Sequence, residues 1–370
     1  CNESKPICAN CARLNLTCVY DRQPPENKPG AVQPKEKAQR PVTKTDDDHG
    51  DPPESERRRK RELQLLLHFV EETGPSLAFD DFSMKVWVLP LPRLALKSDA
   101  LLYAMYCVSA VHSAYQEPEH KERHLSVCHG YLQMSLCEHA KEVSQLSHDN
   151  VDILILTSTL IRLYQCYKLQ ERPLIPYTPP TAWMRSTGSG SALFRQAWPL
   201  IVDNPSSIAK MLIGNIPIVM DKQARTAPES RQGLLHLLQR QEPHELAEPW
   251  SSDVQEAYES TLSYIGGIWI AMNNNENPGG VSKRLVIFPM IVDKRFIALV
   301  EEQRPRALAI LAHYFALLSM LRGYWWMGDT GQREVRAIAE VMPDEWRSLM
   351  SWPLQILEQQ IVFTGEQLNI

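Results

Sequence analysis

Residues 305–327 read PRALAILAHYFALLSMLRGYWWM. Over this stretch apolar side chains fall on nearly every side of a helix. They include Leu308, Ile310, Leu311, Leu317, Leu318 and Leu321. A helix that is apolar all round is buried on all sides, so we predict a central core helix here. Pro305 suits its first turn, where the missing N–H would be unpaired in any case.

Helical periodicity recurs on both sides of this segment. Ser98 is predicted to cap a helix that ends near Tyr115. Further helical patterns cover about 119–145, 150–167, 191–202, 206–213, 228–240, 251–272, 290–303, 331–341 and 352–362. The Pro- and Gly-rich residues 173–190 predict a loop. Only 86–91 and 285–288 resemble strands or extended loop, so the predicted fold class is all-α.

The composition bounds the class of protein. The chain has 370 residues, of which 44% are hydrophobic, and a formal net charge of −5, so a large buried core is expected. No apolar run approaches the roughly 18 residues of a membrane-spanning helix, so no membrane span is predicted. The chain opens on Cys1 without a secretory signal pattern, and we expect its N-terminus to be truncated or processed.

Charge and cysteine content divide the chain into three predicted segments. Residues 1–61 carry a net charge of +3 and residues 62–370 a net charge of −8, and four of the eight cysteines lie in the first 18 residues. Residues 23–56 hold seven prolines and no aromatic residue, which is typical of a disordered linker. The predicted domains are a cysteine-rich module at 1–22, this linker at 23–56 and a helical domain at 57–370.

The N-terminal cysteines have the spacing of metal ligands. Cys1, Cys8, Cys11 and Cys18 are separated by six, two and six residues. A Cys-x2-Cys pair grips one tetrahedral Zn²⁺ and further cysteines complete its four ligands. Disulfides would need an oxidising compartment, for which the sequence has no signal. Zinc is the predicted cofactor, with disulfides and incidental cysteines as the alternatives.

CNESKPICANCARLNLTCVY, residues 1–20, resembles the C-terminal two-thirds of the fungal Zn₂Cys₆ binuclear cluster. Cys1, Cys8, Cys11 and Cys18 match the third to sixth cysteines of that motif, and Pro6 and the trailing Val19-Tyr20 also match. The resemblance implies two zinc ions per complete cluster. The first two cysteines of the motif and the basic stretch after them are absent from residues 1–370, so the ligand set here is incomplete.

The same resemblance implies double-stranded DNA as a partner and the nucleus as the location. In the family a basic helix enters the major groove and reads a CGG-type half-site. Without that segment, we expect residues 1–370 to bind DNA weakly and mainly through phosphates. Lys5 and Arg13 are the candidate phosphate contacts, with ordinary surface charges as the alternative.

The helical part resembles the fungal-specific transcription-factor domain of the sterol-uptake-control type. The resemblance covers roughly residues 75–360. It is carried by YTPPTAWMR at 177–185, RPRALAILAHYFALL at 304–318 and the segment 346–353. It implies an all-helical regulatory or ligand-sensing domain, and a sterol in the sterol regulators themselves.

Five consecutive cations, Arg57, Arg58, Arg59, Lys60 and Arg61, precede the first predicted helix of this domain. Such a run is typical of a nuclear-localisation signal or of phosphate contacts. The alternative is a solvated helix N-terminus, although cations oppose the helix dipole there.

His120, His124 and Cys128 recur at intervals of four residues, with His129 adjacent. On a helix the first three would share a face and could hold a metal ion, or they are ordinary residues of a helix flank. The run TGSGS at 187–191 is either an anion-binding turn before a helix or a flexible loop.

Aromatic residues gather at the end of the central segment. Phe315, Tyr324, Trp325 and Trp326 are predicted either to pack in the core or to line a pocket for a hydrophobic small molecule.

The sequence contains no hydrolase, metalloprotease or dinucleotide motif, so we predict that the protein is not an enzyme. The predicted function is an RNA polymerase II-type, sequence-specific DNA-binding transcription regulator with a zinc cluster. The alternative is a helical protein that senses a small molecule or lipid, such as a sterol, without binding DNA. A second copy of the chain, as a homodimer, is a further candidate partner.

Overall fold

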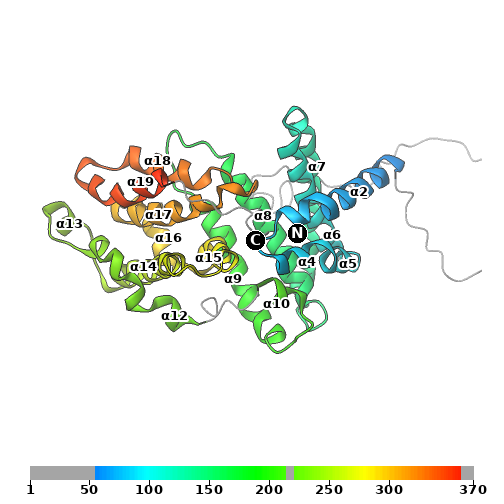
Figure 1. Cartoon of the computed structure of the whole chain (residues 1–370), viewed down its shortest axis with the longest axis horizontal. Coiled ribbons are helices and arrows are strands. Elements are labelled where there is room, and N and C mark those ends of the chain that lie inside the picture. Colours follow the sequence, from blue (N-terminus) through cyan, green and yellow to red (C-terminus); the bar gives the residue numbers. More distant parts are fainter. Residues whose placement is uncertain (1–54, 214–220, 360–370) are drawn as a thin grey trace, which may run out of the picture. The chain divides into compact units, whose positions relative to one another are not determined.

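The computed structural model describes residues 55–213 and 221–359 (Figure 1). Within those two ranges every regular element is helical and none is a strand, which confirms the predicted all-α fold class. The chain divides into two compact units, Cys1–Glu62 and Leu63–Ile370, and we call the second unit the helical body. The predicted domain limits at 22 and 56 stay predictions.

The first half of the described chain contains helices that vary widely in length. They are α2 (Glu56–His68), the π-helix η1 (Phe69–Thr73), α3 (Gly74–Ser76), α4 (Asp81–Val88), α5 (Pro90–Ala95), α6 (Asp99–Gln116), the 3₁₀ turn η2 (Pro118–His120), α7 (Lys121–Val143), α8 (Val151–Gln170), α9 (Thr181–Ile201) and α10 (Ile208–Ile213).

The second half follows the same pattern of long helices joined by short ones. Its elements are α12 (Lys222–Thr226), the 3₁₀ helix η3 (Pro228–Leu238), α13 (Pro243–Ala247), α14 (Ser252–Asn273), α15 (Pro278–Ile291), α16 (Lys294–Glu301), α17 (Pro305–Leu318), the 3₁₀ helix η4 (Ser319–Gly323), α18 (Thr330–Val341), the 3₁₀ helix η5 (Asp344–Met350) and α19 (Ser351–Glu358).

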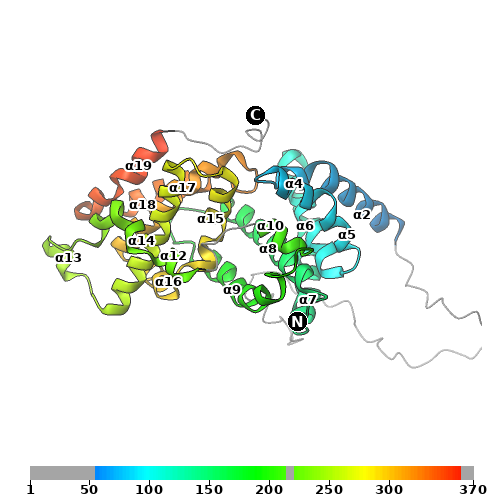
Figure 2. The ribbon, with the colours of Figure 1, turned by 60° about the horizontal axis from the view of Figure 1, so that its bottom comes forward.

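Within the helical body, α9 lies between two groups of helices. In both views α4–α8 and α10 gather on one side of it and α12–α19 on the other (Figures 1 and 2). The contacts agree, because α9 packs on α8 in the first group and on α15 and α16 in the second. A space bounded by α9 is therefore walled by segments from both halves of the sequence.

The central core helix is α17, as predicted. Each of its residues from Arg306 to Leu318 is buried, and it contacts α14, α15, α16, α18 and α19. The regular helix ends at Leu318 rather than continuing to Trp326, because the chain tightens into η4. Gly331 brings α18 close to this turn, since a Cβ atom there would lie 2.5 Å from the Phe315 carbonyl oxygen.

The loop predicted at 173–190 is wrong in its second half, because α9 begins at Thr181. The run 187–191 is consequently helical and is neither a flexible loop nor a turn before a helix. Its glycines serve helix packing. A Cβ atom at Gly188 would lie 3.1 Å from the Pro289 carbonyl oxygen of α15, so glycine permits this close approach. Glycine costs about 1 kcal/mol in a helix interior, which tertiary packing offsets here.

Both strand-like segments are helical, which corrects the prediction of strand or extended loop. Residues 86–91 end α4 and begin α5, and residues 285–288 lie inside α15. In each case a capping side chain at the N-terminus of the helix stabilises its first turn. The Asp80 carboxylate accepts a hydrogen bond from the Ser83 N–H at 2.6 Å, and the Asn277 side chain accepts from two N–H groups of α15. Such caps satisfy donors that a helix start leaves unpaired.

Two other predicted helices differ in kind. The segment predicted at 228–240 is the 3₁₀ helix η3, and the segment predicted at 290–303 contains the end of α15 followed by all of α16. The Asp293 carboxylate causes that second break, because it accepts a hydrogen bond from the Arg295 N–H and starts α16.

Because two histidines are buried, we predict that the helical body loses stability in mild acid. Burial lowers the pKa of both His112 and His313 to about 4, from an ordinary value of 6.5. As pH falls below 6.5, these two imidazoles bind protons in the unfolded chain but stay neutral in the folded chain. The free energy of unfolding therefore decreases as pH falls towards 4. Between pH 7 and pH 5 each histidine should remove about 2 kcal/mol from the free energy of unfolding.

Urea unfolding at pH 7 and pH 5 measures this loss. The variant His313→Gln should show a pH-dependent loss that is smaller by about 2 kcal/mol than in the wild-type chain. Equal losses in the two proteins would show that His313 is not held neutral in the fold.

None of the helices in the described ranges combines the length and the apolar character that a bilayer crossing requires.

Candidate functional site

The predicted zinc ligands and phosphate contacts lie outside the described residues. They are Cys1, Cys8, Cys11 and Cys18, with Lys5 and Arg13, and nearly all of the predicted linker lies outside as well. The chemistry of the donor set still bears on the metal. Four thiolates that include a Cys-x2-Cys pair fit one tetrahedral Zn²⁺ ion, because they complete its four-coordinate shell without any other ligand.

The basic run Arg57–Arg61 lies in the first turns of α2. Lys60 Nζ is 2.6 Å from Glu56 Oε1, and Arg58 Nε donates to Glu62 Oε1 at 2.9 Å. These pairs, spaced four residues apart, partly offset the unfavourable interaction of cations with the helix N-terminus. Arg57, Arg59 and Lys60 are exposed. Their predicted role in nuclear import or phosphate contact stays a prediction.

His124 and Cys128, two of the residues predicted as metal ligands, contact separate partners. His124 Nε2 lies 3.0 Å from a carboxylate oxygen of Glu117, and the buried Cys128 Sγ lies 3.3 Å from Cys107 Sγ. Burial raises the pKa of the Cys128 thiol, which disfavours the thiolate that a metal would need. In the part of the chain that the structure describes, no three His, Cys, Asp or Glu residues are grouped to hold a metal ion.

The aromatic residues Phe315, Tyr324, Trp325 and Trp326 are all buried. Trp325 stacks on His112 with ring centroids 4.7 Å apart, and its Nε1 donates to Ser76 Oγ at 2.9 Å. Tyr324 and Trp326 pack edge-on against Phe79 at centroid distances of 5.1 and 5.9 Å. This arrangement is core packing. Phe79, which contacts Tyr324 and Trp326, also lines the cavity described next.

A mostly apolar cavity of about 330 Å³ lies in the helical body. It is bounded by α4, α8, α9, α10, α12 and α15. Its apolar walls are Leu77, Phe79, Trp87, Ile155, Leu163, Phe194, Leu212, Ile213, Val286, Ile287, Met290 and Ile291. The volume lies at the low end of the range of small-molecule sites, about 300–1,000 Å³. The four aromatic residues predicted to line a pocket are not among the wall residues, although Phe79 of the wall packs against two of them, Tyr324 and Trp326.

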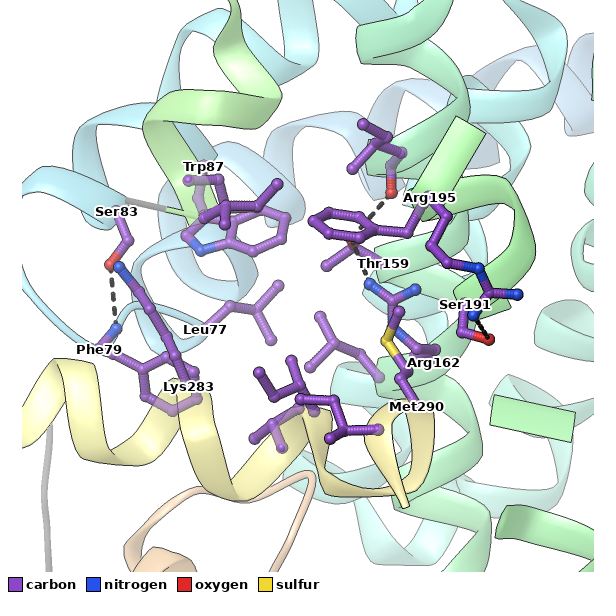
Figure 3. Close-up of a pocket in the computed structure, with 18 of the residues that line it drawn as sticks. Leu77, Phe79, Ser83, Trp87, Thr159, Arg162, Ser191, Arg195, Lys283 and Met290 are labelled. Carbon is purple, nitrogen blue, oxygen red and sulfur yellow. Dashed lines mark hydrogen bonds between the residues drawn. The ribbon is translucent and has the colours of Figure 1, made fainter. Parts of the chain in front are cut away.

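Among the residues that the structure describes, four cations and no carboxylate line this cavity. The cations are Arg162 on α8, Arg195 on α9, Arg225 on α12 and Lys283 on α15. Figure 3 shows Arg162 and Arg195 on one side of the cavity and Lys283 on the opposite side, with Leu77 between them. The Lys283 charge is balanced, because its Nζ lies 3.1 Å from Asp80 Oδ2.

The arginines on the other side hydrogen-bond to hydroxyl groups. Arg162 Nη2 donates to Thr159 Oγ1 at 2.8 Å, and Arg195 Nη1 donates to Ser191 Oγ at 3.4 Å. Burial lowers the pKa of Arg162 to about 10, so it is still a cation at neutral pH. Burial also lowers the pKa of Arg225, while the nearby Tyr264 and Asp221 raise it and the Arg195 charge lowers it. This side of the cavity therefore has a positive potential.

The sequence did not identify this cavity, because six helices that are distant in sequence form it. One signal was available. Arg162 is a charge in the middle of α8, VDILILTSTLIRLYQCYKLQ, far from Asp152 and Lys168 near its ends, and a charge at such a position needs either a counterion or a water-filled space. Arg195 follows the glycines of α9 by more than one turn. What its side chain faces depends on how α9 packs, which the local sequence does not show.

Comparison with known proteins identifies the N-terminal module. Residues 1–27 match the fungal Zn(2)-Cys(6) binuclear cluster domain. A Zn(2)-C6 fungal-type transcription factor, afumD, of Aspergillus fumigatus is 30% identical over 321 residues, which are 85% of this chain and 80% of that protein.

Two further relatives are more distant. A Zn(2)-C6 fungal-type transcription factor of Gibberella zeae is 25% identical over 84% of this chain and 63% of its own length. Sterol uptake control protein 2 of Saccharomyces cerevisiae is 21% identical over 70% of this chain and 27% of its own length. The similarity thus extends from the cysteine-rich segment through most of the helical body. The chain belongs to the family of Zn(2)-C6 fungal-type transcription factors, the sequence-specific DNA-binding regulators of transcription.

Proposed function

We propose that Cys1, Cys8, Cys11 and Cys18 hold zinc and that the metal-bound module binds double-stranded DNA in the nucleus. The match of residues 1–27 to the zinc-cluster domain is the observation that carries this proposal. The domain's description counts six cysteines, and residues 1–370 supply four of them. The protein acts without an enzymatic reaction, and Arg57–Arg61 serve nuclear import or an added phosphate contact. A homodimer on DNA stays a prediction.

Salt-dependent binding tests the DNA contact. Lys5 and Arg13 would neutralise two phosphates, so the affinity of residues 1–370 for a random duplex should fall about tenfold between 50 and 200 mM salt. Fluorescence anisotropy with a labelled duplex measures this. The double variant Lys5→Gln/Arg13→Gln should bind more weakly and lose most of the salt dependence.

Arg336→Gln is the matched control, because Arg336 is an exposed cation on α18. It should leave DNA affinity unchanged. An unchanged salt dependence in the double variant would mean that other residues contact the phosphates.

A second candidate function is favoured by the cavity. A mostly apolar cavity between helices suits a hydrophobic small molecule whose binding would regulate the factor. The alternative protein, a ligand sensor that does not bind DNA, would use the same cavity. Zinc-dependent DNA binding separates the two, since only the transcription factor requires it.

A further inference from the structure

We propose that the cavity binds an aliphatic carboxylate, with the carboxylate at Arg162 and Arg195 and the hydrocarbon body against the walls of α4 and α15. Only the biological consequence of this binding rests on the regulatory role proposed above for the cavity. Binding itself is a property of the helical body and is independent of DNA.

The charge on the cavity lining carries the proposal. Arg162, Arg195 and Arg225 line it, and within 55–213 and 221–359 no Asp or Glu does. Among the described residues, neither Arg162 nor Arg195 forms an ion pair with a carboxylate, and their hydrogen bonds go to hydroxyl groups of their own helices. Burial withdraws Arg162 from bulk water, where a cation is costly unless it is paired, so an incoming anion gains more beside Arg162 than at the surface, and the exposed Arg195 adds a second cation.

Head-group chemistry follows from the arginine side chain. A guanidinium presents parallel N–H donors that match the two oxygens of a carboxylate. The Thr159 and Ser191 hydroxyls already hold one donor of each arginine and limit its rotation, which leaves other N–H groups for a ligand.

The opposite wall requires an apolar body. Trp87 of α4 lines the cavity across from the two arginines, and Lys283 on that side is already paired with Asp80, whereas Met290 of α15 adds apolar surface beside Arg162 (Figure 3). A small inorganic anion would leave these apolar walls uncovered. A neutral alcohol, such as a sterol, would cover them but leave the arginine charges unbalanced. An anionic amphiphile satisfies both sides.

Isothermal titration of the chain of residues 1–370 tests the head group with matched probes. Decanoate, methyl decanoate and decanol share an unbranched alkyl chain, a neutral sterol offers a different apolar body with a hydroxyl group, and acetate carries the head group alone. Decanoate is expected to bind saturably and at least about tenfold more tightly than its ester or the alcohol, because a charged hydrogen-bonded pair is lost in both. Acetate should not compete at equal concentration.

Variants test the location. Arg195→Gln and Arg162→Gln should each weaken decanoate binding by about tenfold or more. Arg195 is exposed, so its substitution keeps the test valid if Arg162→Gln fails to fold. Arg185→Gln is the matched control, since Arg185 lies on the same helix α9, pairs with Glu301 and does not line the cavity. It should bind decanoate like the wild-type chain.

Equal affinity for decanoate and its ester, tighter binding of the sterol, or no saturable binding of decanoate would each overturn the proposal. So would an Arg195→Gln chain with wild-type affinity. These measurements contain no DNA, so loss of the DNA-binding function would leave them unchanged.

Discussion

Replacing Arg306 by leucine is expected to lower the free energy of unfolding by about 3–5 kcal/mol. Arg306 is fully buried in the first turn of α17, and its Nε donates to Glu248 Oε2 at 2.7 Å. Its Nη1 donates to the Leu237 carbonyl oxygen at 2.6 Å, and the guanidinium lies 5.1 Å from the centroid of the Trp346 ring. Leucine would leave the buried Glu248 carboxylate without its cation, and that unpaired charge is the source of the cost.

Urea unfolding at neutral pH measures the loss, and a second substitution tests its cause. Adding Glu248→Gln to Arg306→Leu removes the buried negative charge, so the double variant should be more stable than Arg306→Leu alone. The Tyr258 hydroxyl, which donates to Glu248 Oε1 at 3.0 Å, would keep an amide oxygen as acceptor. A loss below about 1 kcal/mol for Arg306→Leu would show that this ion pair does not organise the start of α17.

Trp326→Ala is expected to cost a further large amount, about 3–5 kcal/mol, because it removes a fully buried indole. Trp326 packs against Phe79 and Tyr324, with ring centroids 5.9 and 5.7 Å away. Since Phe79 also lines the cavity, the loss of its support should weaken decanoate binding as well.

Trp326→Phe is the control for this substitution. It keeps an aromatic ring beside Phe79 and removes an indole N–H that has no acceptor among the described residues. Its cost in thermal or urea unfolding should therefore be clearly smaller than that of alanine. Equal costs for phenylalanine and alanine would mean that ring packing is not what Trp326 contributes.

The sequence predicts the core of this fold better than its connections. Apolar residues on all sides of 305–318 are enough to predict the buried helix α17, because burial follows from local composition. The prediction of a loop through Gly190 was wrong because glycine can have either of two effects on a helix. It breaks an isolated helix, but at Gly188 it admits the backbone of α15, and that neighbour is not visible in the local sequence.

The same limit applies to the sites. The predicted metal ligands Cys8 and Cys11 are separated by only two residues, so their spacing alone predicts their chemistry. The cavity brings Arg162, Arg195 and Lys283 together from three helices, and no short pattern records that convergence. Tyr324–Trp326 attracted attention as an aromatic cluster, yet such clusters serve a packed core as readily as a pocket.

The central claim is that zinc held by the N-terminal cysteines supports sequence-specific DNA binding. Its most direct test is competitive anisotropy on residues 1–370 extended at the N-terminus by the two cysteines and the basic stretch that the Zn₂Cys₆ motif places before its third cysteine. A CGG-containing duplex should be preferred over a scrambled one by about a thousandfold or more at physiological salt. Cys11→Ser, or a zinc chelator, should abolish that preference while urea unfolding of the helical body stays unchanged. A preference that survives Cys11→Ser, or none in the extended chain, would contradict the account.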